Sequence, residues 1–154
     1  MSRLLDLDAL RAQFLNKEFD AKEFRFDAAQ LADYAIACGE RAPRYTDPGH
    51  PDFQAPPTFA TSLRPDRRLP DGFPKLPGLG MDAGKAVAPL APIRPDTTVT
   101  GRSHLHEIYA KTGRSGRMTF FVIRMELSDA SGTLLAHADT RVVIREKPEE
   151  GESE

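Results

Sequence analysis

The stretch Arg117-Met-Thr-Phe-Phe-Val-Ile-Arg-Met-Glu-Leu-Ser128 alternates as a β-strand does, and it decides the fold class. Successive side chains of a strand point to opposite sides, so one face of this segment is entirely apolar. That face carries Phe121, Ile123, Met125 and Leu127. At its start the other face is apolar too, with Met118, Phe120 and Val122. We therefore expect this end of the strand to be buried on both sides.

Two further strands flank this one. Residues 97–111 precede it, and Gly113 and Gly116 mark the turn between the two segments. Asp129-Ala-Ser-Gly132 is a hairpin signal, and residues 133–145 follow it with strict alternation and one polar face. The three segments predict an antiparallel meander.

Helices and a short strand come before the meander. Residues 4–11 alternate leucines with charges, which predicts an amphipathic helix, and residues 18–26 read as a strand. Asp27 can cap a helix over residues 28–38, with Gln30 completing a capping box and Gly39 ending the helix. Segregated helices and strands predict an α+β fold, with a curved antiparallel sheet wrapped around a helix.

The middle region, residues 42–95, holds all but one of the 13 prolines. Proline lacks an N–H and fixes φ, so we expect no continuous regular structure there. A short helix beginning near Pro57 is compatible, because proline is tolerated in a first turn. The apolar residues of the region, among them Phe53, Phe59 and Phe73, argue against disorder. We therefore expect a long overhanging segment that packs onto the rest of the domain.

Composition limits the classes of function. The 154 residues suggest one domain, residues 1–147, followed by an acidic flexible tail, residues 148–154. The net charge of -2 gives no basic footprint for nucleic acid. The single cysteine, Cys38, is expected to be a small buried residue of the helix. No apolar run is long enough to cross a membrane, so the chain reads as cytoplasmic.

Three short patterns follow one another in order: Tyr34-Ala-x-Ala-x-Gly39, Pro43-x-Tyr45-x-Asp47 and Ala55-Pro-Pro-Thr-Phe59. Together with residues 100–118, they resemble the MaoC-like dehydratase family, in its N-terminal type of hot-dog domain. The resemblance implies a hot-dog fold and an acyl-CoA or acyl carrier protein thioester as ligand. It implies neither a cofactor nor a metal. It also assigns substrate contacts to Tyr34, Pro57, Thr58 and Phe59.

The residues that would carry the family's chemistry are altered. Active relatives, the R-specific enoyl-thioester hydratases, carry Gly-Asp-x-Asn-Pro-aliphatic-His, in which the Asp and His activate a water. This chain has Glu40 in place of the Asp, Ala42 in place of the Asn and Tyr45 in place of the His. The backbone N–H that polarises the thioester carbonyl would fall near Pro57, which has none.

These departures favour a non-catalytic subunit that shapes an acyl pocket for a second hot-dog subunit carrying the Asp/His pair. One alternative is an active homodimeric hydratase that uses Glu40 with Tyr45 or His50. Another is an acyl-CoA-binding module without catalysis. A thioesterase is a more distant alternative, because hot-dog folds host that chemistry too.

Some polar residues allow two interpretations. Arg114 and Arg117 flank a turn, where they either contact a CoA phosphate or are exposed cations. His104 and His106 alternate on a strand and share a face, but no third metal ligand is evident, so solvated or core histidines are favoured.

Overall fold

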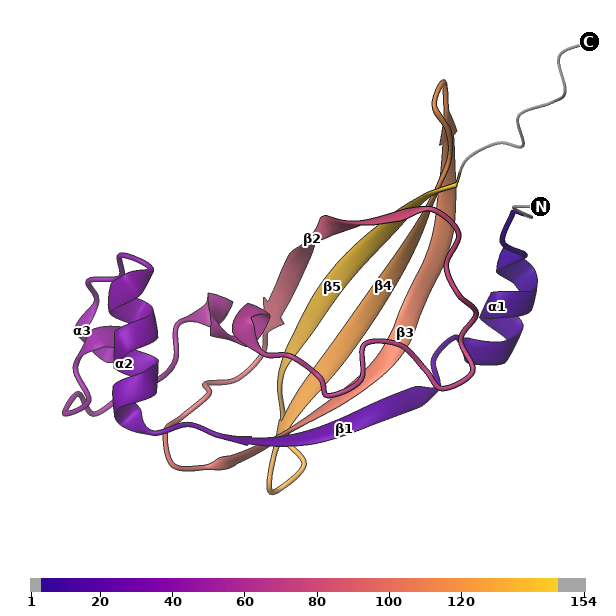
Figure 1. Cartoon of the computed structure of the whole chain (residues 1–154). Coiled ribbons are helices and arrows are strands. Elements are labelled where there is room, and N and C mark those ends of the chain that lie inside the picture. The colour runs from indigo at the N-terminus through magenta and orange to yellow at the C-terminus, as the bar shows by residue number, and fades with distance from the viewer. Residues whose placement is uncertain (1–3, 147–154) are drawn as a thin grey trace, which may run out of the picture.

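The computed structural model describes residues 4–146. Its helices are α1 (Leu7–Phe14), α2 (Ala28–Ala37), α3 (Pro43–Thr46) and the 3₁₀ helix η1 (Pro57–Ser62), and its strands are β1 (Glu18–Arg25), β2 (Leu79–Pro89), β3 (Thr98–Gly113), β4 (Gly116–Asp129) and β5 (Leu134–Glu146). The strands form one antiparallel sheet in the order β1-β3-β4-β5-β2 (Figure 1). The predicted α+β class is confirmed.

The predicted meander is confirmed. The turn glycines, Gly116 and Gly132, have φ of 104° and 85°, values that side chains disfavour. Ile123 on β4 pairs with Leu105 on β3 and with Thr140 on β5, which aligns their side chains on one face. We call this the inner face and the opposite one the outer face. At the start of β4 the outer face is only half covered, because Met118 and Phe120 remain half-exposed.

The strand β2 was not expected, because the proline-rich region was predicted to lack continuous regular structure. The prolines of this region flank the strand: Pro77 precedes it, Pro89 ends it, and none lies between them. The 11-residue strand pairs with β5 along one edge, with a register shift between Asp82 and Lys85. The prediction overlooked this proline-free interval.

Helix α2 forms as the sequence predicts. The Asp27 side chain accepts a hydrogen bond from the Gln30 N–H at 2.8 Å, and the Asp27 N–H donates to the Gln30 side chain at 2.9 Å. Gly39 has φ of 81°, and the Glu40 N–H donates to the Ala35 carbonyl at 3.0 Å, which closes the last turn. Cys38 is exposed rather than buried, because it sits at the cap where the helix ends.

We expected the sheet to wrap around this helix, and its position refines that expectation. Helix α2 packs against α3 and η1 at one end of the sheet, whereas η1 contacts β2 and β5 on the inner face (Figure 1). Leu31 and Ala32 of α2 join Phe59, Val99 and Leu127 in one hydrophobic cluster. None of the helices in residues 4–146 is long and apolar enough to cross a membrane.

Residues 63–78, which we call the strap, run from η1 across the inner face toward α1 and then reach β2 (Figure 1). The buried Asp20 carboxylate on β1 accepts hydrogen bonds from the Asp66 and Arg67 N–H groups, at 3.1 and 3.2 Å. The ring of Phe73 lies 5.0 Å from that of Phe14 and 5.6 Å from that of Phe121, between centroids. The strap is thus attached to β1 and to the core.

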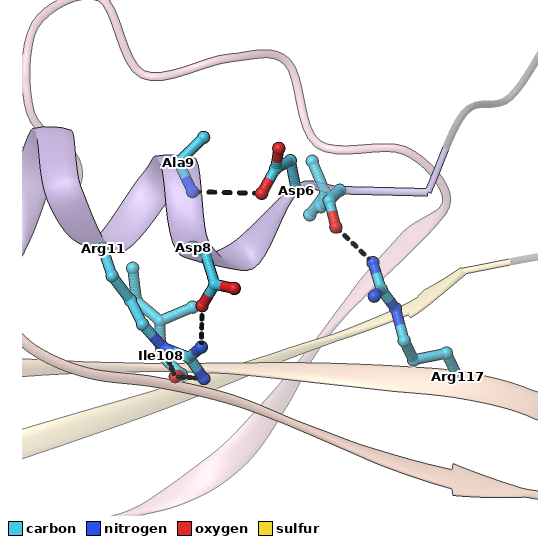
Figure 2. A network of polar contacts seen from close by, with 7 residues as sticks. Asp6, Asp8, Ala9, Arg11, Ile108 and Arg117 are labelled. Carbon is cyan, nitrogen blue, oxygen red and sulfur yellow. Dashed lines mark hydrogen bonds and ion pairs between the residues drawn. The ribbon is translucent and has the colours of Figure 1, made fainter.

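Helix α1 is fixed to the other end of the sheet, as Figure 2 shows. Arg11 donates to the Ile108 carbonyl through Nε and Nη2, at 2.9 and 2.7 Å. Arg117 Nη2 donates to the Leu5 carbonyl at 2.5 Å and to Glu146 Oε2 at 2.9 Å. Arg117 thereby ties the entry to α1 to the last residue of β5.

Glu146, the last residue of β5, is only 1% exposed. Its two carboxylate oxygens accept from Arg117 and from the Thr119 hydroxyl, the latter at 2.8 Å. This pairing keeps the residue within the sheet. The predicted tail, residues 148–154, lies outside the described residues.

Candidate functional site

The predicted catalytic residues lie on one segment but do not form an assembled acid–base group. Glu40 follows the cap of α2, Tyr45 lies on α3 and His50 lies in the loop after it, and all three are half-buried. In residues 4–146, no hydrogen bond joins their side chains. His50 Nδ1 instead accepts from the Asp52 N–H at 3.0 Å, and the Tyr45 ring contacts the Arg44 guanidinium.

The predicted substrate contacts on α2 and η1 are brought together. The Tyr34 hydroxyl donates to the Thr58 carbonyl at 3.2 Å, and its ring meets Phe59 edge-on at 5.1 Å. Pro57 occupies the first turn of η1 and is exposed, as is Thr58, whereas Phe59 is buried in the core. These residues fix η1 to α2, so their clearest structural role is to hold η1 above the sheet.

Arg114 and Arg117 lie at the β3–β4 turn, at the α1 end of the sheet and away from η1 (Figure 1). Arg114 is exposed on the turn itself. Arg117 is engaged by the buried Glu146 and by the Leu5 carbonyl. Its guanidinium therefore already has structural partners.

A cavity of about 420 Å³ lies where η1 and the strap cover the inner face beside β2. This volume falls within the range typical of small-molecule sites. Its buried floor consists of Ser103, Ile123 and Met125. Further apolar lining comes from Ala60, Leu63, Met81, Ala138 and Val142. An extended apolar group bound there would cross the sheet from β2 toward β3.

The rim of the cavity is basic. Arg64 and Arg68 of the strap and Lys85 of β2 line it, with Asp82 as the acidic neighbour on β2. Burial lowers the pKa of Lys85, and the positive charge of Arg64 lowers it further, while Asp82 partly opposes both. Lys85 Nζ donates to the Thr140 hydroxyl at 3.3 Å. An anionic group at the rim would relieve the repulsion between these cations.

Sequence reasoning missed this cavity, because its lining comes from five separate parts of the chain: η1 with the strap, β2, β3, β4 and β5. One signal was nevertheless visible. The inner row of β3 reads Val99, Gly101, Ser103 and Leu105, so a hydroxyl interrupts an otherwise apolar row. A serine at such a position indicates either a partner or a binding site.

The two predicted strand histidines lie side by side on the outer face. His104 Nε2 and His106 Nδ1 are 3.4 Å apart, and both residues are half-buried. Burial lowers the pKa of His104, Glu126 opposes this, and the nearby His106 and Arg124 lower the pKa further. Within residues 4–146 no group of three His, Cys, Asp or Glu side chains could hold a metal ion.

Comparisons with solved structures show the fold. A chain of the MaoC-like dehydratase from Rhodospirillum rubrum superimposes with a TM-score of 0.61 at 18% identity, covering 90% of this chain and 97% of that one. A chain of the C-terminally truncated HadBC (3R-hydroxyacyl-ACP dehydratase) complex from Mycobacterium tuberculosis gives 0.56 at 16% identity, covering 79% and 90%. The predicted hot-dog fold is confirmed.

Sequence comparison shows the family. A UPF0336 protein of Saccharopolyspora erythraea is 27% identical over 158 residues, covering 94% of this chain and 97% of that protein. The family model for the FAS1-like dehydratase domain region matches residues 13–138. This chain therefore belongs to the family of the FAS1-like dehydratase domain region, and it has the fold of the MaoC-like dehydratase structure.

Proposed function

We propose that this chain is the non-catalytic subunit of a heteromeric enoyl-thioester hydratase, or 3-hydroxyacyl-thioester dehydratase. Its inner-face cavity holds the acyl chain, and a second hot-dog subunit supplies the Asp/His pair that activates water. The observation that carries the proposal is the pairing of a largely apolar cavity with unassembled catalytic residues. The cavity can enclose an acyl chain, whereas Glu40, Tyr45 and His50 share no hydrogen bond in the described part of the chain.

The departures from the active pattern support this division of labour. General acid–base catalysis needs a group within hydrogen-bond reach of the proton it moves. The nitrogen of His50 that could serve as a base already accepts a backbone hydrogen bond. Pro57 leaves the first turn of η1 without the N–H that would polarise a thioester carbonyl. A partner subunit would supply the missing groups.

The basic rim supports an anionic carrier. Arg64, Arg68 and Lys85 line the mouth of an apolar cavity, which suits a ligand with an apolar chain and a phosphate-bearing head. CoA and the phosphopantetheine arm of acyl carrier protein both have this character. The same three cations would bind either one, so a competition assay with CoA and with acyl carrier protein distinguishes the carriers.

The exposed edge of strand β2 is where we place the partner subunit. It is an edge strand, since β5 is its one neighbour in the sheet, and an edge strand offers unpaired backbone groups to another chain. Leu79 is 71% exposed and Met81 is 38% exposed, so apolar side chains accompany this edge. Met81 also lines the cavity. A hot-dog partner bound at β2 would therefore lie beside the cavity mouth, where the thioester enters.

The test is reconstitution. The purified full chain should not hydrate crotonyl-CoA above the uncatalysed rate. Co-expression with a hot-dog subunit that carries Gly-Asp-x-Asn-Pro-x-His should give a complex on size-exclusion chromatography and restore hydration. Hydration by this chain alone at the rate of the complex would contradict the proposal and return catalysis to Glu40, with Glu40→Gln as the deciding variant.

A matched pair of variants tests the partner edge. Leu79→Lys places a charge on the β2 edge and should weaken assembly, whereas Leu90→Lys, at an exposed position just beyond β2, should not. Equal assembly of both variants, measured by analytical ultracentrifugation, would remove β2 from the interface.

A further inference from the structure

Ser103 carries a buried hydroxyl without a partner. Its side chain is fully buried on the inner face of β3, and within residues 4–146 its Oγ has no hydrogen-bond partner. Buried polar groups are almost always paired, because an unpaired one loses its hydration without compensation. Ser103 also lines the cavity. An unpaired hydroxyl in the wall of a cavity is suited to a ligand atom that packs against that wall.

Thr119 is a buried hydroxyl that serves as a comparison for Ser103, because it lies outside the cavity lining. Thr119 lies on the inner face of the adjacent strand β4 and is as fully buried as Ser103. Its Oγ1 donates to Glu146 Oε1 at 2.8 Å. Ser103 and Thr119 are therefore equally buried and differ in whether their hydroxyl has a hydrogen-bond partner.

The groups around Ser103 leave its hydroxyl free. Ser103 pairs in register with Asp20 on β1 and with Met125 on β4. The Asp20 carboxylate is engaged by the Asp66 and Arg67 N–H groups. The Met125 sulfur lies over Gly101, only 2.7 Å from where a Cβ would stand there, so the glycine gives this side chain its room. The carboxylate is occupied and the methionine leans toward the preceding inner position.

Ser103 lies far from the part of the cavity rim that Lys85 forms. Lys85 at the rim lies on β2, and β5 and β4 separate that strand from β3. Three strand spacings amount to roughly 14 Å. A ligand whose anionic head rests beside Lys85 would therefore meet Ser103 with a remote part of its chain and not with its thioester.

We propose that Ser103 determines specificity: it hydrogen-bonds an oxygen atom carried by the acyl chain deep in the cavity. The cavity thus selects acyl thioesters that bear a hydroxyl or oxo group remote from the thioester over plain chains of equal length. This assignment rests on the proposed acyl-binding function, and it adds the class of chain that is bound.

Binding calorimetry on the full chain tests the assignment. The ligands are plain acyl-CoAs from octanoyl to dodecanoyl and their ω-hydroxy counterparts. One hydrogen bond at a fixed depth should favour the ω-hydroxy ligand about fivefold, with the preference greatest at one chain length. Ser103→Ala should abolish the preference, and the matched variant Thr119→Val should keep it.

The unliganded protein gives a second, independent readout. Removing an unpaired hydroxyl should stabilise the fold, so Ser103→Ala should raise Tm by about 2–4 °C, whereas Thr119→Val should lower it. A lower Tm for Ser103→Ala would mean that the hydroxyl is paired within the protein, which overturns the assignment.

The outcomes separate the two proposals. Plain and ω-hydroxy chains that bind equally well overturn the role of Ser103 and leave the acyl-binding function standing. A preference that survives Ser103→Ala does the same. Failure of every acyl-CoA to bind overturns both.

Discussion

Two regions of the inner face differ in whether their buried polar groups are paired. At the α1 end, the carboxylate of Glu146 is 1% exposed and is paired with Arg117 and Thr119. In the cavity, Ser103 has no partner within residues 4–146 and Lys85 is held at a lowered pKa by burial and by Arg64. The first region joins the segment before α1 to the end of β5. The second leaves Ser103 unpaired within residues 4–146 and pairs Lys85 with the neutral Thr140 hydroxyl, so a ligand can use both groups.

The comparison teaches that stability and binding are divided along one sheet. The α1 end combines the paired polar groups with a cluster built around Phe14, Leu105 and Phe121. The cavity region is instead covered by the strap, which is held to β1 through Asp20. Substitutions at the α1 end should therefore change folding stability, and substitutions in the cavity should change ligand binding.

The largest expected effect is that of Glu146→Ala. It removes a buried carboxylate and leaves Arg117 and Thr119 without their partner, which should cost about 3 kcal/mol of unfolding free energy. Urea denaturation followed by circular dichroism measures this. Glu107→Ala, at an exposed site on β3, is the control and should be near neutral. Equal urea midpoints for the two variants would contradict the claim that the paired groups at the α1 end stabilise the fold.

A smaller effect is expected where the strap joins β1. Asp20→Asn removes the charge that accepts two backbone N–H groups, which should weaken the strap's attachment by about 1.5 kcal/mol. Trypsin should then cleave after Arg67 and Arg68 roughly tenfold faster, if cleavage follows local opening. Glu23→Gln, at an exposed position on the same strand, should leave the rate unchanged. Unchanged cleavage in Asp20→Asn would show that other contacts hold the strap.

The smallest expected effect is on the pH dependence of ligand binding. The folded protein lowers the pKa of Lys85 from 10.5, first through burial and then through Arg64. A bound anion favours the charged lysine and raises its pKa again. Affinity for an acyl-CoA should therefore fall as pH rises through the lowered pKa. Lys85→Gln should weaken binding about fivefold at neutral pH and flatten this dependence. An unaltered pH profile in that variant would exclude Lys85 from the anion site.

Local patterns predicted the local structure well. The capping box of α2 and the alternation of the meander are encoded in neighbouring residues, and both are confirmed. Strand β2 was missed because the average proline content of its region hid a proline-free interval. Cys38 was misplaced because it falls where α2 ends.

The candidate site was harder to predict, because it depends on long-range packing. Tyr34 and Phe59 belong to two separate sequence patterns, and the fold brings their rings into edge-on contact, while their role as substrate contacts stays a prediction. The hydrogen bond between Thr119 and Glu146 joins residues on different strands, so no local sequence pattern predicts it. The same holds for the cavity, in which Lys85 of β2 and Ser103 of β3 face one space.

The most direct test of the central claim is the chain-length dependence of hydration by the reconstituted complex that carries Ala138→Leu in this subunit. Ala138 lines the cavity, so the larger side chain should fill space that only a long acyl chain uses. We predict that KM for a decenoyl-CoA rises at least about tenfold, while kcat/KM for crotonyl-CoA is unchanged. Equal changes for both substrates, or no change for either, would contradict the claim that this subunit holds the acyl chain while its partner performs the chemistry.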